Sequence, residues 1–174
     1  NGAPLTPDHG APVRLAVPGR HGIKSVSWAT PIELLREHYQ GYFQRQRYVY
    51  DAPDGLSPVT RMRVKSIIRE PVEGAVCERR VTVFGWAWSG DGPITRVEVG
   101  VDGGDQWHDA ALGTPASVFA WTPWQLVVEL PRSGRFVLRS RATDATGAVQ
   151  PDAIVWNRLG YGNNAIRQVV IEVR

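Results

Sequence analysis

The stretch Phe84–Trp107 limits most strongly what this chain can fold into. It contains three of the seven tryptophans and six of the eighteen glycines of the 174-residue sequence. From Thr95 onward, β-branched residues alternate with polar ones, and a period of two is typical of a half-buried β-strand. Turn sequences flank this strand, because glycine supplies the positive φ that tight turns need. One face carries Thr95, Val97, Val99 and Val101, the other carries Arg96, Glu98 and Asp102, and the turns are Asp91-Gly92-Pro93 and Asp102-Gly103-Gly104.

Similar short strands follow one another along the second part of the chain, separated by glycine- and proline-rich turns. This pattern predicts an all-β fold, an immunoglobulin-like β-sandwich. The single cysteine, Cys77, excludes an intrachain disulfide, so a true antibody-type domain is excluded. We expect Cys77 to be a small, buried residue of a strand edge. The predicted strands are Val64–Arg69, Val81–Trp88, Ile94–Val101, Gln106–Leu112, Trp121–Leu130, Arg135–Asp144 and Ala165–Arg174.

The first 62 residues have a different character. We expect a short strand over Val13–Val17, and Thr30-Pro31 with Glu33 resembles a helical capping box, although the residues that follow fit a helix or a strand equally. Residues 51–62 have the composition of a linker. About 50 irregular residues do not readily form a core of their own. We therefore predict an irregular N-terminal part over residues 1–62 and the sandwich over residues 63–174.

Composition excludes several functional classes. Hydrophobic residues make up 43% of the sequence and charged residues 21%, which suits a packed core. The net charge of +3 comes from scattered arginines, so no nucleic-acid partner is expected. No apolar run is long enough for a membrane segment. The acidic pair around Asp102 and Asp105 offers too few oxygens for calcium, and no metal ligands are assigned. The compartment is unknown, and an extracytoplasmic or membrane-associated parent is compatible with the sequence.

Several blocks of the second part closely resemble the C-terminal dimerisation domain of the sulfite oxidase family. That family comprises molybdenum-cofactor oxidoreductases and includes eukaryotic-type nitrate reductase. The blocks occur in the family's order over residues 64–174. They are Gly85-Trp-Ala-Trp-Ser-Gly90, Ile94-Thr-Arg-Val-Glu-Val99, Phe119-Ala-Trp-Thr-Pro-Trp124, Ala142-Thr-Asp-Ala145 and Trp156-Asn157 with Gly160.

The N-terminal part resembles the end of the same family's cofactor domain. His9-Gly-Ala-Pro-Val-Arg14 and the segment that ends at Trp28 follow its motif. The resemblance implies that His9, Arg14 and the backbone of Ser25, Val26 and Ser27 bind the molybdopterin. Arginine suits the phosphate, because its planar guanidinium donates two parallel, charge-assisted hydrogen bonds. Tyr48, in Arg45-Gln-Arg-Tyr48, matches the family's active-site tyrosine.

Two departures from the family pattern bear on function. The cysteine that ligates molybdenum in the family precedes the matching segment, and Cys77 is not that residue. Sulfite oxidases also carry Trp-Asn-x-Arg-Gly, whose arginine helps form the sulfite pocket, whereas this chain has Leu159 at that position and Arg158 one step before it. An apolar residue there argues against sulfite as the substrate.

The resemblance implies the C-terminal part of a molybdopterin-dependent oxidoreductase of the sulfite oxidase type. Its expected partners are a second copy of itself, a small inorganic or small-molecule substrate, and a haem or cytochrome acceptor. By itself the chain is expected to be inactive and not to retain molybdenum-molybdopterin. The alternative is a non-enzymatic immunoglobulin-like binding or adhesion module. Considered one by one, His9 and Arg14 are also compatible with solvated side chains, and Tyr48 with an aromatic residue that only packs. The tryptophan pairs Trp86/Trp88 and Trp121/Trp124 are compatible with packing in the core or in an interface.

Overall fold

The computed structural model describes residues 2–103 and 106–174 and divides the chain into two compact units. The first unit contains the residues up to Met62 together with Trp156–Asn163, and the second contains Arg63–Val155 and Asn164–Arg174. Asn1, the expected turn glycine Gly104 and the acidic residue Asp105 lie outside the described ranges.

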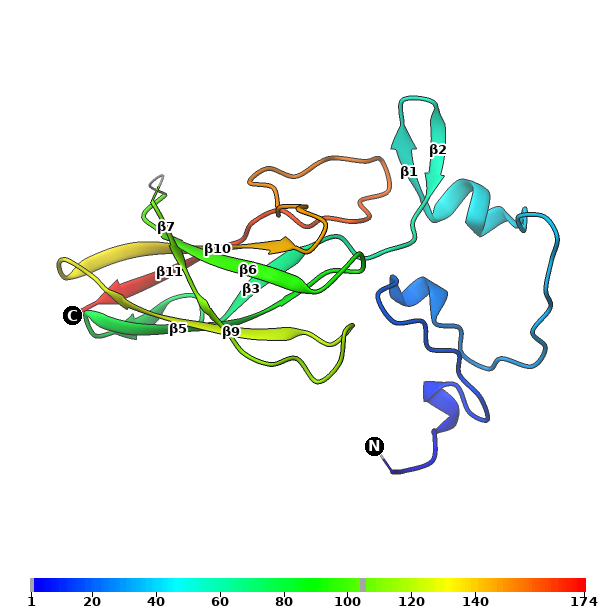
Figure 1. The fold of residues 1–174 in the computed structure, drawn as a ribbon, viewed down its shortest axis with the longest axis horizontal. Coiled ribbons are helices and arrows are strands. Elements are labelled where there is room, and N and C mark those ends of the chain that lie inside the picture. The colour runs from blue at the N-terminus through cyan, green and yellow to red at the C-terminus, as the bar shows by residue number, and fades with distance from the viewer. Residues whose placement is uncertain (1, 104–105) are drawn as a thin grey trace. The chain divides into compact units, whose positions relative to one another are not determined.

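The second unit is a sandwich of two β-sheets, as the sequence predicts (Figure 1). One sheet has five strands in the order β4-β11-β10-β6-β7, and the other has four in the order β3-β5-β9-β8. Pairing is antiparallel except between β11 and β4, which run parallel. The strands are β3 (Lys65–Glu70), β4 (Ala75–Cys77), β5 (Arg80–Trp88), β6 (Ile94–Val101), β7 (Trp107–Asp109), β8 (Ala111–Leu112), β9 (Thr122–Glu129), β10 (Gly134–Asp144) and β11 (Gln168–Val173).

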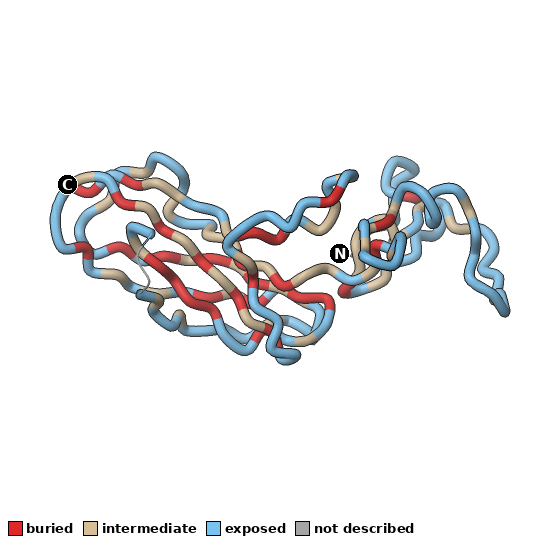
Figure 2. The backbone as a smooth tube through the Cα atoms, turned by 90° about the horizontal axis from the view of Figure 1, so that it is seen from above, coloured by how far each residue is buried: buried red, intermediate tan, exposed pale blue. Residues whose placement is uncertain are grey.

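The core lies between the two sheets and is built from alternate residues of the long strands. Figure 2 shows buried positions recurring along these strands, as a period of two requires. The largest buried side chain, Trp124 of β9, lies over Gly85 of the neighbouring strand. The central members of the core are Val81, Val83, Ala87, Val97, Val99, Trp124, Leu130, Phe136, Leu138 and Ile171.

The expected strand Gln106–Leu112 is divided in the structure. Trp107–Asp109 pairs with β6 of the five-stranded sheet, whereas Ala111–Leu112 pairs with β9 of the four-stranded sheet. Ala110 lies between them, and its N–H donates to the carbonyl of Val97 at 2.8 Å. This segment therefore crosses from one sheet to the other, which alternation along a single strand does not reveal.

The first unit differs from the sequence predictions in three places. Val13–Val17 forms no strand, and residues 29–41 form neither the capping-box helix nor a strand. Residues 30–40 are all exposed, so no apolar partner orders them as a regular element. The predicted linker is instead a hairpin of β1 (Val49–Ala52) and β2 (Gly55–Pro58). The first unit also contains three short helical turns, which are η1 (Pro7–His9), η2 (Gly22–Lys24) and the π-helix η3 (Phe43–Arg47).

Candidate functional site

Two segments of the first unit lie side by side and form a loop cluster, which we define as residues 9–15 and 25–29. Backbone hydrogen bonds join them: the N–H of Leu15 donates to the carbonyl of Val26 at 2.9 Å, and that of Ala29 to Val13 at 3.0 Å. The N–H of Trp28 donates to the carbonyl of Gly10 at 3.3 Å. The structure thus brings the two halves of the predicted cofactor motif together.

Gly10 allows this close approach. Its φ is +99°, which favours glycine, and a Cβ at this position would lie 2.8 Å from Cβ of Ser27. Trp28 closes the cluster from the other end, because its Nε1–H donates to the carbonyl of Pro7 at 2.9 Å. The backbone at Ser27 is therefore held against the turn that follows His9.

The charged and polar side chains of the motif lie on the surface of the loop cluster. His9 and Arg14 are exposed, and Nη1 of Arg14 lies 3.4 Å from the carbonyl oxygen of His9. Nδ1 of His9 is 2.7 Å from Oγ1 of Thr6, which fixes the orientation of the imidazole. Oγ of Ser25 accepts from the N–H of Val17 at 3.2 Å, so this hydroxyl supports the loop.

Tyr48 follows the π-helix η3 and lies among aromatic rings. Its ring stacks on Phe43 with a centroid distance of 5.5 Å and meets the edge of Tyr161 at 5.9 Å. Its N–H donates to the carbonyl of Phe43 at 2.7 Å, and its carbonyl accepts from Val59 at 2.8 Å. The backbone of Tyr48 is thus fixed by both the helix and the hairpin.

The departure from the family motif at residues 158 and 159 has a clear local structure. Arg158 is paired with Asp51: its backbone N–H and its Nε each lie 3.0 Å from a carboxylate oxygen. Asn157 closes the turn, since its Oδ1 accepts from the N–H groups of Leu159 and Tyr161 at 3.2 and 3.3 Å. Arg158 therefore points at the hairpin, and Leu159 keeps the position of the family's arginine.

Leu159 lines a pocket of about 420 Å³ within the first unit. Three arginines contribute to its wall, so the pocket is basic although Leu159 is apolar. The sequence motif indicated Arg45 and Arg47 only as part of the run before Tyr48, and the pairing of Asp51 with Arg158 was missed. The hairpin signal Asp54-Gly55 could have revealed this geometry. The lining residues are Tyr42, Arg45, Gln46, Arg47, Leu56, Arg158 and Leu159.

The donors of the loop cluster fit a phosphorylated, heteroaromatic cofactor. Arg14 and His9 are both exposed, the guanidinium of Arg14 lies 3.4 Å from the backbone carbonyl oxygen of His9, and the backbone beside them is held where Gly10 faces Ser27. Arginine and histidine donate hydrogen bonds to phosphate and to ring heteroatoms. The donor set is that of an anion and ring-edge site.

The remaining candidates for chemistry are few. Among residues 2–103 and 106–174, no group of three or more His, Cys, Asp or Glu side chains could hold a metal ion. Cys77 lies half-buried in the edge strand β4, where burial raises the pKa of its thiol.

Among the residues that the structure describes, no helix is both long enough and apolar enough to span a membrane.

The fold and the loop cluster define a class: an immunoglobulin-like sandwich joined to a segment with an anion-binding donor set. The chain belongs to the family described as "Mo-co oxidoreductase dimerisation domain", whose model matches residues 57–174. The model described as "Oxidoreductase molybdopterin binding domain" matches residues 1–43. The resemblance found from the sequence motifs is therefore confirmed.

Individual relatives agree with this assignment. The chain is 35% identical over 191 residues to mitochondrial sulfite oxidase of Mus musculus, which covers 99% of the chain and 35% of that protein. It is 29% identical to an NADH nitrate reductase of Hordeum vulgare, covering 99% of the chain and 22% of that protein. The crystal structure of the sulfane dehydrogenase SoxCD from Paracoccus pantotrophus superposes with a TM-score of 0.80 at 32% identity, covering 94% of this chain and 44% of that one. The chain thus spans about a third of the length of the sulfite oxidases it matches.

Proposed function

We propose that this chain is the dimer-forming part of a molybdopterin-dependent oxidoreductase and that its N-terminal segment completes the cofactor site. One observation carries the proposal: a single chain matches, in order, a molybdopterin-binding model over 1–43 and a dimerisation model over 57–174. The predicted domain boundary between residues 62 and 63 stays a prediction. The compact units of the structure are not continuous in sequence, because Trp156–Asn163 belongs to the first unit.

Within the loop cluster, His9 and Arg14 would hold the phosphate and the ring edge of the cofactor. The backbone of Ser25, Val26 and Ser27 would bind the cofactor as well. Two-electron oxidation coupled to oxo transfer is the chemistry that such a cofactor supplies when bound. The role of this segment is to bind and orient the cofactor through donors that the loop already fixes.

Tyr48 is the proposed active-site residue. Its backbone is held from two sides, and its ring packs between Phe43 and Tyr161, so its hydroxyl has a defined direction. A phenol in this role donates a hydrogen bond to an anionic substrate and orients it. The electron acceptor is proposed to be a haem or cytochrome.

The substrate is proposed to be a reduced sulfur compound other than sulfite. Leu159 replaces the arginine expected of a sulfite oxidase, and Arg158 is engaged by Asp51. The solved relative at TM-score 0.80 is a sulfane dehydrogenase, which makes sulfane sulfur the preferred candidate. The remaining arginines of the pocket, Arg45 and Arg47, suit an anionic sulfur group.

Cofactor content tests the role of the loop cluster. In the protein expressed from its complete gene, Arg14→Gln should weaken cofactor binding about 10- to 100-fold, the effect of losing a charged hydrogen bond. Molybdenum per protomer, measured by mass spectrometry of purified protein, would then fall. Arg36→Gln, an exposed arginine outside the motif, is the matched control. Equal molybdenum in both variants would exclude the proposed role of Arg14.

Dimerisation is tested separately by sedimentation equilibrium of the 174-residue chain. A dimer is expected. A strict monomer at high concentration would contradict this part of the proposal and would favour the alternative, a non-enzymatic binding or adhesion module, which the family match does not support.

A further inference from the structure

The outward face of the four-stranded sheet is unusually aromatic. In β5, Val81, Val83 and Ala87 point into the core, so the alternate residues Phe84, Trp86 and Trp88 point outward. Outward-facing positions of a solvated sheet are normally polar. A row of three aromatic residues on one strand of the sandwich therefore indicates a surface that becomes covered.

Neighbouring residues extend this row across the sheet. Trp121, just before β9, stacks on Trp88 with a centroid distance of 4.7 Å, and Phe84 meets Trp86 edge to face at 5.6 Å. Trp121 is 49% exposed, and Val127 of β9 is 47% exposed. We call this surface the aromatic face, defined as Phe84, Trp86, Trp88, Trp121, Pro123 and Val127.

The aromatic face also contains a hollow. A pocket of about 550 Å³ lies between Trp86, Trp121 and Pro123, and the loop before β9 closes its rim. The same loop presents Val118 and Phe119, which are 68% and 49% exposed. Buried aromatic anchors in such pockets dominate the binding energy of many protein interfaces.

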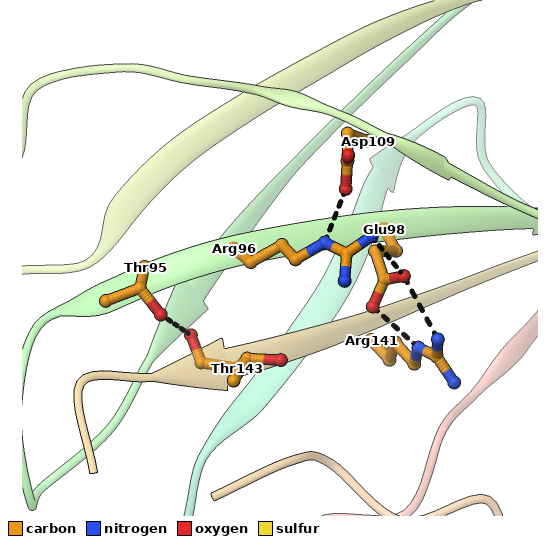
Figure 3. A network of polar contacts seen from close by, with 6 residues as sticks. All are labelled: Thr95, Arg96, Glu98, Asp109, Arg141 and Thr143. Atoms are coloured by element: carbon orange, nitrogen blue, oxygen red, sulfur yellow. Dashed lines mark hydrogen bonds and ion pairs between the residues drawn. The ribbon is translucent and has the colours of Figure 1, made fainter. Parts of the chain in front are cut away.

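The outward face of the opposite sheet has a different character (Figure 3). Glu98 is buried there although the sequence places it on the polar face, and it accepts hydrogen bonds from Arg141 at 2.8 and 3.0 Å. Arg96 lies 3.0 Å from Glu98 and 2.6 Å from Asp109. The guanidinium of Arg141 also lies over the ring of Trp107, 4.2 Å from its centroid. The charges around Glu98 are thus paired within the chain.

We infer that the aromatic face is the surface through which a second copy of this chain binds. The inference rests on the proposed dimerisation and adds its location. The dimerisation model spans the entire sandwich, and the aromatic face gathers large apolar side chains around a hollow, whereas the centre of the opposite face carries the charges around Glu98, which are paired within the chain. A twofold axis brings the same patch together from both copies. Each copy then offers both the pocket and the exposed apolar residues of its rim.

Charge substitutions on the two faces test the inference. Val127→Lys and Trp121→Lys should each raise the dimer dissociation constant about 30-fold or more, as for a disrupted hot spot. The matched control is Val76→Lys on β4 of the opposite sheet, because Val76 is 53% exposed and Val127 is 47% exposed. The control should leave the dissociation constant unchanged in sedimentation equilibrium of the 174-residue chain.

A second measurement does not depend on weakening the dimer. With Cys77→Ser as background, Gln125→Cys places a thiol on the exposed middle of β9, opposite Phe84. Its alkylation by N-ethylmaleimide should slow at protein concentrations above the dissociation constant, whereas Val76→Cys should react at a constant rate.

The outcomes separate this inference from the proposed function. If the unmodified chain dimerises but face variants and control behave alike, or Gln125→Cys alkylation is independent of concentration, the aromatic face is not the interface and dimerisation stands. If the unmodified chain is a monomer, both fail.

Discussion

Gly85 shows how one residue determines the packing of the sandwich. A Cβ at this position would lie 2.1 Å from the carbonyl oxygen of Ile67 and 2.3 Å from the ring of Trp124. Both neighbours are fixed, the first by β-sheet pairing and the second by burial. The absent side chain of Gly85 therefore makes room for the largest residue of the core.

We predict that Gly85→Ala lowers the free energy of unfolding by about 3 kcal/mol, because overpacking a rigid core costs about 1–3 kcal/mol or more. Urea unfolding followed by tryptophan fluorescence measures it. The control is Gly92→Ala, whose Cβ would lie 3.4 Å from Cβ of Ala145 and which should change stability by less than about 1 kcal/mol. A similar loss in both variants would contradict this account of Gly85.

Asp144 is a buried carboxylate that supports the turn after β10. Burial alone would raise its pKa, but hydrogen bonds outweigh that effect and lower the pKa below its ordinary value of 3.8. The donors are the hydroxyl groups of Thr146 at 2.6 Å and Ser89 at 2.7 Å, and the N–H groups of Thr146 and Ala148. Because the folded pKa is depressed, the ionised carboxylate stabilises the fold above about pH 4, and this stability is lost as pH falls through the folded pKa.

Asp144→Asn should therefore cost about 1–3 kcal/mol at pH 7, and the difference from the unmodified chain should shrink below pH 4. Thermal unfolding measured between about pH 2 and about pH 7 gives both the cost at neutral pH and its decrease in acid. Asp152→Asn is the control, since that carboxylate is 70% exposed and lies 3.7 Å from Arg139. A difference that grows as pH falls would overturn this assignment.

At the scale of single residues, alternation predicts burial well wherever the core alone decides it. Val97 and Val99 are buried as expected, whereas Thr95, which was assigned to the same face, is exposed. Alternation fails at Glu98, because two arginines cover it: Arg141 of the neighbouring strand β10 and Arg96 of its own strand β6. A period of two assigns a face to each residue, but it does not show which long side chains fold over that face.

At the scale of elements, the pairing of β6 with β10 is reinforced by the charges around Glu98. We predict that Glu98→Gln lowers the free energy of unfolding by about 1–3 kcal/mol, because two charged hydrogen bonds from Arg141 lose their charge. Denaturant unfolding measures it. Glu129→Gln is the control, because its pair with Arg80 is 67% exposed on the carboxylate side and exposed pairs contribute less than about 1 kcal/mol. Equal losses would show that burial of Glu98 has no particular importance.

Element prediction succeeded for the long strands of the sandwich and failed for the first unit. In long strands such as Gly134–Asp144, buried residues alternate with more exposed ones, because only one side of the strand faces the core. Residues 30–40 are exposed throughout, and Ile32 and Leu34 are 81% and 95% exposed. Apolar residues without a partner carry no periodic signal, so propensity and capping patterns there did not predict the structure.

At the scale of the whole molecule, the motif located the loop cluster but did not reveal the basic pocket. His9, Arg14 and Ser25–Ser27 fall in one chain segment, so spacing alone could group them. The pocket at Leu159 joins residues 42–47 to a loop more than a hundred positions later in the sequence. Only the fold brings Arg45 and Arg47 beside Leu159, and no spacing pattern crosses that distance.

The pocket yields a prediction that rests on the proposed oxidoreductase activity. Leu159→Arg adds a cation to a wall that already contains Arg45, Arg47 and Arg158. A further unit charge near a bound anion contributes about 1 kcal/mol in solvent-exposed surroundings, which corresponds to about a fivefold change in affinity. With the protein expressed from its complete gene, sulfate should therefore inhibit the variant at about one fifth of the concentration that the unmodified enzyme requires.

Ionic strength and a control variant make this prediction specific. The gain should diminish as salt is raised, because exposed charges are screened over about 8 Å at physiological ionic strength. Leu35→Arg adds the same charge on the first unit, at a residue that is 52% exposed, lies outside the loop cluster and does not line the pocket. An equal gain from Leu35→Arg would show that the effect comes from net charge alone. A gain confined to Leu159→Arg would show that the residue at this position sets the affinity of the pocket for anions, and that its apolar side chain disfavours sulfite.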